Sequence, residues 1–263
     1  MGALDIEGGT RVNPAFTSDF ADEVTRIIDK AQKKGIVIRV MGGTVIRIHC
    51  PEFLHLHTTM KREPGDIDFM TYSRFNPSIK PLFVELGYVP DERFNAYFGI
   101  MRQKYMNLKN RRIAEVFFDK LEMCHTIDFR GRLELDYPTI TLADFLLEKM
   151  QIVQLNEKDS IDTIVLLREH GIGDFEKETI NAAYIARLLA KDWGLYYTVT
   201  TNLSKVKEYA RSTLSEEDSR DVMAKIDQLL EWIEKEPKTT AWKMRARIGP
   251  KKKWYRDVEE VVR

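Results

Sequence analysis

Hydrophobic residues near the start of the chain recur at the spacing of one helix face. Their positions predict a helix that Thr17 or Ser18 caps and that Gly35 ends. The apolar members of this face are Phe20, Val24, Ile27, Ile28 and Ala31. A short β-branched run at 36–41 follows and predicts a buried strand that stops at Gly42.

The middle of the chain alternates between apolar and polar positions, which predicts strands. The predicted strands are 66–70, 94–106, 112–122 and 126–129. The polar residues 107–110 make the middle two an antiparallel hairpin. A short helix is predicted at 77–86, and the prolines and glycine within 49–65 predict a loop there.

From Pro138 onward the hydrophobic period is helical. The predicted helices are 142–155, 157–170, 174–193, 195–213 and 215–235. This change of period predicts three parts: an α/β domain at 1–137, a helical domain at 138–237 and a basic tail at 238–263.

Composition narrows the class of protein only a little. Lys+Arg and Asp+Glu balance at 41 each, so overall charge does not indicate a nucleic-acid or membrane partner. Cys50 and Cys124 have no zinc or disulfide spacing and predict two reduced thiols. No apolar run reaches the ~20 residues of a transmembrane helix, and no signal pattern opens the chain. We therefore expect a cytoplasmic protein without a membrane partner.

Two short motifs carry the candidate chemistry. The turn Gly42-Gly43-Thr44 follows a predicted strand and opens a short helix, where backbone N–H groups can approach a phosphate. Asp66 and Asp68 lie in another strand-like run and would share one face, roughly 6.6–7 Å apart at Cα. Two adjacent buried carboxylates need compensating cations, and a divalent metal supplies them.

A third acid would complete a metal-binding cluster, and three positions stay open. Glu115 and Asp119 share one face of the predicted strand 112–122, and Asp128 lies one strand later. Asp128 also fits a simple ion pair with Arg130 or Arg132. A separate histidine-rich segment at 49–57 has no standard metal-site spacing and predicts a loop with incidental histidines.

The order of these motifs resembles the nucleotidyltransferase superfamily, which has a polymerase-β-like fold. Within it, the chain is most similar to the abortive-infection toxin-type group. The resemblance lies in the stretches MGGTVIRIHCP, KREPGDIDF, AEVFFDKLEMCHTIDFRGRLEL, LADFLLEKMQIV and NEKDSIDTIVLL, within residues 36–170. It implies an α+β fold in which flanking helices cover a small mixed sheet, followed by a C-terminal helical domain. The 22 residues between Gly43 and Asp66 make a longer gap than the superfamily usually has.

The resemblance implies transfer of a nucleoside monophosphate from an NTP, such as ATP, to an acceptor, with release of pyrophosphate. It implies Mg²⁺ or Mn²⁺ at Asp66 and Asp68, and triphosphate contacts from the turn at 42–44. Glu115 best matches the third acid. The implied acceptor is a tRNA or other RNA, a protein or a small molecule, and an antitoxin is an implied partner.

Two lysines of the predicted helical domain match nucleotide-contacting positions of the toxin-type group. They are Lys149 and Lys158, the latter followed by Asp159. Lys149 equally fits a surface position on an amphipathic helix, and Lys158-Asp159 fits a charge pair at a helix start.

The tail changes the picture again, because residues 238–256 contain no acid. Their basic residues are Lys238, Lys243, Arg245, Arg247, Lys251, Lys252, Lys253 and Arg256. Trp242, Trp254 and Tyr255 are interleaved, a pattern that suits RNA binding through phosphate contacts and stacking. Docking of the aromatics on the protein, with solvated charges or a partner protein, is the alternative. A nucleotide- or RNA-binding module without catalysis therefore competes with the enzyme hypothesis.

Overall fold

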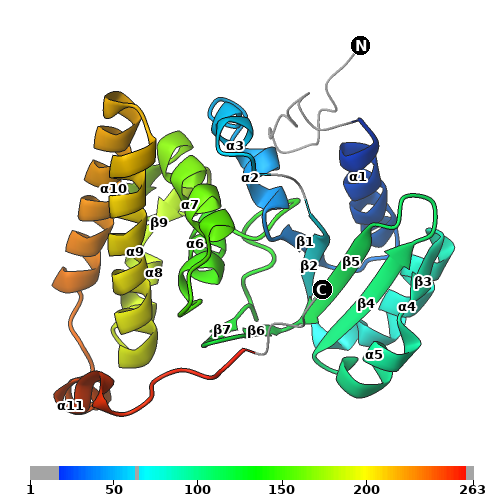
Figure 1. The fold of residues 1–263 in the computed structure, drawn as a ribbon. Coiled ribbons are helices and arrows are strands. Elements are labelled where there is room, and N and C mark those ends of the chain that lie inside the picture. Colours follow the sequence, from blue (N-terminus) through cyan, green and yellow to red (C-terminus); the bar gives the residue numbers. More distant parts are fainter. Residues whose placement is uncertain (1–17, 63–64, 259–263) are drawn as a thin grey trace. The chain divides into compact units, whose positions relative to one another are not determined.

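The computed structural model describes residues 18–62 and 65–258, which form a mixed α+β fold (Figure 1). The chain divides into two compact units. The first runs to Leu121 and includes Asp128–Thr141, and the second combines Glu122–Ile127 with the chain from Leu142 onward. Thr17, proposed above as a helix cap, lies outside the described residues.

Helices occur throughout the chain, and the strands are short. The helices are α1 (Ser18–Lys33), α2 (Thr44–His49), α3 (His55–Thr59), α4 (Asn76–Glu85), α5 (Glu92–Phe98), α6 (Leu142–Met150), α7 (Glu157–Glu169), α8 (Ala182–Leu189), α9 (Trp193–Thr213), α10 (Glu216–Lys235) and α11 (Thr240–Ile248), with 3₁₀ turns η1 (Ser73–Phe75) and η2 (Gly249–Lys251). The strands are β1 (Ile38–Met41), β2 (Ile67–Thr71), β3 (Tyr88–Pro90), β4 (Arg102–Asn107), β5 (Ile113–Phe118), β6 (Lys120–Glu122), β7 (Thr126–Asp128), β8 (Gly171–Gly173) and β9 (Thr179–Asn181).

A mixed five-stranded sheet is the centre of the first unit, in the order β1-β2-β5-β4-β3. β2 and β5 are parallel, whereas β1–β2, β5–β4 and β4–β3 are antiparallel. The register places Asp68 beside Met41 on one side and beside Glu115 on the other. On the far side of Glu115 lies Lys104. Because neighbours in register point to the same face, Asp68, Glu115 and Lys104 share one face.

The opposite face of this sheet is the apolar core of the first unit. Alternate strand positions such as Val40, Phe69 and Val116 pack there against α1 and α4. Phe83 of α4 stacks on Tyr105 with ring centroids 4.5 Å apart. The predicted helix face from Phe20 to Ala31 is buried in this cluster, as its spacing requires.

Helices make up most of the second unit, and polar side chains define where several of them begin. Asn156, Asn181, Asp192, Ser215 and Thr239 each accept a hydrogen bond from a backbone N–H in the first turn of the helix that follows. The helix predicted from residue 215 is α10, and Ser215 is its cap.

Several predicted elements are wrong in part. The helix predicted at 142–155 ends at Met150, and the strand predicted at 112–122 is divided into β5 and β6. The predicted loop 49–65 contains α3, and the predicted strand 94–106 begins with α5, which Asp91 caps by accepting from Phe94 N. The predicted helix 174–193 is instead β9 and α8, because Asn181 and Asp192 are caps that start new helices. Parallel pairing aligns Gly171 of β8 with Thr179 of β9, and a helical period does not reveal such a pairing.

The tail is also different from a plain basic extension. Residues 240–248 form α11, and the aromatic residues of the tail dock on α9. The alternative in which the aromatics dock on the protein is therefore the observed one. None of the described helices is long and apolar enough to span a bilayer.

Candidate active site

Gly42 and Asp68, two of the predicted site residues, lie directly against each other. Gly42 ends β1 with φ of 70°, a backbone conformation that glycine adopts without strain. A Cβ placed on Gly42 would lie 2.6 Å from Asp68 Oδ2. The carboxylate of Asp68 therefore lies directly against the glycine turn, and only a residue without a side chain leaves it room.

Asp66 belongs to the same edge of the sheet but lies one residue before β2 begins. It is partly buried, and its Oδ2 has no exposure to solvent. A separation of two residues along an extended chain corresponds to roughly 6.6–7 Å between Cα atoms. The structure thus places Asp68 against the turn at 42–44, and Asp66 lies two residues before it in the chain.

Glu115 lies in register with Asp68 on the neighbouring parallel strand. Its side chain is 4% exposed, and it forms ion pairs with Arg102 and, at 3.8 Å, with Lys104. Arg102 also lies over the rings of Phe117 and Phe94, at 4.9 Å and 5.4 Å. We call Glu115, Arg102 and Lys104 the sheet cluster. In it, a buried carboxylate is neutralised by two cations that are 27% and 26% exposed.

This donor set fits a divalent cation through two carboxylates rather than three. Within residues 18–62 and 65–258, no group of three His, Cys, Asp or Glu side chains is arranged to hold a metal ion. Mg²⁺ commonly takes one or two protein carboxylates and completes its shell with water and substrate phosphate. Asp66 and Asp68 suit that mode, whereas the ion pairs of Glu115 occupy its oxygens.

The glycine turn leads directly into α2, whose first residue is Thr44. Gly43 is the N-cap, and no side chain of the described residues caps this helix. Free backbone N–H groups at a helix start favour anionic oxygens. Val45 N donates to Gly42 O at 3.1 Å within this turn, which lies against Asp68. Binding of a phosphate there stays a prediction.

Asp119 and Asp128 have other roles in the structure. Asp119 follows β5 with φ of 60°, and its Oδ1 accepts from Ser73 N at 2.9 Å. Four residues of strand separate it from Glu115, which is about 13 Å at 3.3 Å per residue. Asp128 forms a two-pronged ion pair with Arg130, which lowers the pKa of that carboxyl. The ion-pair interpretation of Asp128 matches this geometry.

Lys149 and Lys158 both lie in the second unit, in different surroundings. Lys149 is buried on α6, where its Nζ lies 3.0 Å from Asp159 Oδ1 and 3.1 Å from Asp162 Oδ2. We call Lys149, Asp159 and Asp162 the helix cluster. Lys158 is exposed. The surface alternative for Lys149 is therefore wrong, and contact of either lysine with a nucleotide stays a prediction.

Arg102 and Lys104 are the residues that sequence reasoning missed. They alternate with Gln103 and Tyr105 on β4, so they share a face. The hairpin prediction already paired this strand with the one carrying Glu115. Reading the register of that hairpin would have placed two cations beside the predicted third acid.

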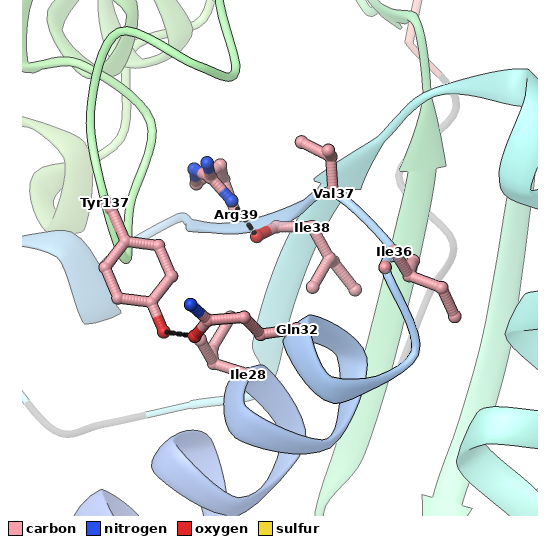
Figure 2. Close-up of a pocket in the computed structure, with 8 residues that line it drawn as sticks. Ile28, Gln32, Ile36, Val37, Ile38, Arg39 and Tyr137 are labelled. Atoms are coloured by element: carbon pink, nitrogen blue, oxygen red, sulfur yellow. Dashed lines mark hydrogen bonds between the residues drawn. The ribbon is translucent and has the colours of Figure 1, made fainter.

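A pocket of about 200 Å³ lies elsewhere in the first unit (Figure 2). It is lined by the end of α1, the start of β1 and Tyr137, whose hydroxyl donates to Gln32 Oε1 at 2.8 Å. Most of its lining is apolar, and it contains none of the predicted site residues. It gives no support to nucleotide binding at that place.

The histidine-rich segment holds no metal cluster in the described part of the chain. His49 is buried and its Nε2 lies 2.7 Å from Thr139 Oγ1, a structural hydrogen bond. Cys50 and Cys124 are buried free thiols. Most of the candidate catalytic residues therefore lie at Gly42, Asp66, Asp68 and Glu115.

Comparison of the chain with protein-family models, curated proteins and solved structures finds no match.

Proposed function

We propose that the protein is a Mg²⁺-dependent nucleotidyltransferase with a polymerase-β-like catalytic sheet. The supporting observation is the Asp68 carboxylate, which lies against Gly42 and has Glu115 in register beside it. A glycine turn, a metal-binding carboxylate and a further strand acid thereby share one edge of a sheet. These are the parts that transfer of a nucleotidyl group requires.

Each residue has a defined part in the proposed reaction. Asp66 and Asp68 hold the metal, and the turn at 42–44 binds the triphosphate through backbone N–H groups. Bound Mg²⁺ would neutralise the charge that develops on the phosphate oxygens. An acceptor hydroxyl oxygen forms a bond to the α-phosphorus, and the bond from that phosphorus to the β-phosphate oxygen breaks. Pyrophosphate leaves with the electron pair, and the hydroxyl proton passes to Glu115.

The sheet cluster explains how Glu115 becomes available for that step. Arg102 and Lys104 are partly exposed, so their charged groups can reach a triphosphate. When they bind phosphate oxygens, Glu115 loses its counter-ions, and its carboxylate oxygens can accept the hydroxyl proton. Binding of the NTP therefore prepares the base, in this proposal.

Lys149 and Lys158 have different parts in the proposal. The ammonium of Lys149 is already neutralised by two carboxylates, so its main contribution is to stabilise the helical unit. Lys158 is free to approach a solvent-borne phosphate because it is exposed.

Labelling of an acceptor tests the proposal. The protein is incubated with α-labelled NTPs, Mg²⁺ and either total RNA or total protein, and label transfer is measured. We expect the D66N/D68N double variant to lose transfer. D128N is a matched acid-to-amide change at a carboxylate that pairs with Arg130, and it should keep transfer. Transfer that survives in the double variant contradicts the assignment.

A nucleotide-binding module without catalysis is the second candidate, and the ion pairs of Glu115 favour it. If these pairs are permanent, the strand acid never acts as a base. Calorimetry with a non-hydrolysable NTP, combined with the labelling assay, separates the two functions. Tight binding with no pyrophosphate release over the full range of acceptors identifies the binding module.

A further inference from the structure

The segment that follows α10 is held on the second unit by its aromatic residues. Trp254 packs edge-on against Tyr197, with centroids 5.0 Å apart, and its Nε1 donates to Thr198 Oγ1 at 3.0 Å. Trp242 of α11 packs against Tyr196 at 5.1 Å. These contacts fix residues 240–256 beside α9, where α11 is drawn in dark red (Figure 1).

A glycine in α9 allows this close approach. A Cβ at Gly194 would lie 2.8 Å from the carbonyl oxygen of Trp254. Arg256 N donates to Cys124 O at 3.0 Å, which ties the end of the segment to the 122–127 stretch of the same unit. The segment is therefore held in a defined position on the second unit.

Four of its eight cationic side chains are used to hold the segment in place. Lys238 donates to the carbonyl oxygens of Ile233 and Glu236. Arg245 lies 4.5 Å from the Trp193 ring and donates to Gly249 O and Lys252 O. Of the remaining two, Lys253 pairs with Asp257 just after the segment, and Arg256 pairs with Glu122.

The other four cations are exposed and form what we call the basic surface. They are Lys243, Arg247, Lys251 and Lys252. Within residues 18–62 and 65–258 their side chains make no ion pair, and the segment 238–256 contains no acid of its own. Lys243 and Arg247 are one helical turn apart and so share a face of α11. Met244 and Ile248 lie beside them, 56% and 46% exposed.

We propose that this basic surface binds the phosphate backbone of single-stranded nucleic acid. Solvated lysines and arginines without counter-ions attract polyanions, and binding releases the condensed counter-ions of the strand. Unpaired bases also offer apolar faces to Met244 and Ile248, which a duplex does not. Because Trp242 and Trp254 point into the protein, bases do not stack on tryptophan at this surface. We therefore expect binding with little preference for base sequence.

Two other anionic partners fit the surface less well. The centres of protein–protein interfaces are depleted of lysine, whereas this surface consists mainly of lysine and arginine. A helix that lies in a lipid surface typically presents Trp or Phe on its apolar face, whereas α11 turns Trp242 inward onto Tyr196 and exposes the smaller Met244 and Ile248. The proposal does not depend on nucleotidyl transfer.

Fluorescence anisotropy with labelled polyuridylate and polydeoxythymidylate tests the proposal, with the whole protein in EDTA and without NTP. Nucleotidyl transfer cannot take place under these conditions, and the variants leave Arg102 and Lys104 unchanged, so the result is separate from the proposed function. We expect K243Q/R247Q/K251Q/K252Q to weaken binding at least tenfold. The matched control K33Q/K109Q/K177Q/R187Q removes the same charge from exposed positions elsewhere and keeps the affinity.

Salt dependence gives a second, quantitative readout. For a single strand, log K falls with log salt at about −0.7 per phosphate contact, so four contacts weaken binding about 50-fold between about 50 mM and about 200 mM salt. This slope should be lost in the quadruple variant, and K243R/K251R/K252R should retain both slope and affinity. The two labelled strands show whether the ligand is RNA, DNA or both.

Two results would overturn the proposal. One is equal affinity and equal salt slope in wild type and the quadruple variant. The other is binding of phosphatidylserine vesicles or polyglutamate, lost in the quadruple variant, by a protein that binds neither nucleic acid. Circular dichroism of every variant checks that the helical unit is folded.

Discussion

The sheet cluster and the helix cluster are built from the same chemical groups in opposite proportions. In the sheet cluster one carboxylate lies between two cations, and in the helix cluster one ammonium lies between two carboxylates. The cations of the sheet cluster are about a quarter exposed, whereas Lys149 is 9% exposed and Asp162 is fully buried. The first arrangement can exchange a partner with solvent or ligand, and the second cannot.

The pKa of Lys149 shows how strongly the helix cluster holds its charges. Burial acts to lower the pKa of Lys149, but the carboxylates of Asp162 and Asp159 outweigh it and hold the pKa above its ordinary value. A lysine whose folded pKa is raised stabilises the protein fully below its unfolded pKa, and this stabilisation is lost only as pH rises through the folded pKa. Near neutral pH the helix cluster is therefore permanently charged and contributes constantly to stability.

The largest expected effect comes from breaking the helix cluster. Lys149→Met leaves Asp159 and Asp162 without the ammonium that neutralises them, and we expect unfolding to become easier by about 3–5 kcal/mol. Urea unfolding measures this change, and Lys158→Met, which is exposed, should change stability by less than about 0.5 kcal/mol. A decrease of less than about 1 kcal/mol in the free energy of unfolding of Lys149→Met would show that solvent reaches the helix cluster.

The next largest effect is expected for Gly42→Ala, and comparison with Gly35→Ala separates the collision with Asp68 from backbone strain. Gly42 and Gly35 have φ of 70° and 68°, but a Cβ at Gly35 meets nothing within 4 Å. Either alanine costs about 1–2 kcal/mol for the left-handed conformation, and Gly42→Ala costs about 1–3 kcal/mol more because it collides with Asp68. Gly42→Ala should also abolish label transfer, which Gly35→Ala should keep. Equal activity of the two variants contradicts the placement of Asp68.

Opening the sheet cluster has a smaller effect on stability and a specific effect on binding. Glu115→Gln leaves Arg102 and Lys104 without a counter-charge, but their exposure limits the cost to about 1–2 kcal/mol. The freed cations should bind an NTP about three- to tenfold more tightly in EDTA, as calorimetry would show. Label transfer should nevertheless be lost, because the base is gone. Weaker binding in this variant would mean that Arg102 and Lys104 do not face the triphosphate.

The smallest effect is expected at the acid that the structure removes from the site. Asp119→Asn keeps an Oδ1 acceptor for Ser73 N and tolerates a φ of 60°. Stability should change by less than about 0.5 kcal/mol, and label transfer should be unchanged. A large loss of transfer would make Asp119, and not Glu115, the third acid.

Local pattern was enough to predict elements whose burial follows one period. The face from Phe20 to Ala31 is apolar at helical spacing and is buried as α1. The hairpin of β4 and β5 also follows from alternation and a polar turn. These elements depend on neighbours in the chain, which the sequence displays directly.

What pattern did not predict depends on contacts between distant residues. α6 ends at Met150, where Asn202 donates to Met150 O and Ile152 O, so a residue some fifty positions away limits the helix. Likewise, Glu115 was recognised as an acid, but its pairing with Arg102 is a property of strand register. The pair Asp66 and Asp68 was visible in sequence because its spacing alone carries the hypothesis.

The short stretch Glu122–Ile127 has a consequence for synthesis on the ribosome. It belongs to the second unit although residues of the first unit flank it on both sides. Two of its anchors come from the other end of the chain, since Arg256 N donates to Cys124 O and its Nη2 donates to Thr126 Oγ1 at 2.8 Å. These bonds form only after more than a hundred further residues have been translated. The stretch therefore lacks these two hydrogen bonds during the period in which the first unit can already fold. Truncation just before Arg256 should therefore destabilise the stretch Glu122–Ile127 before it affects the residues at the new terminus.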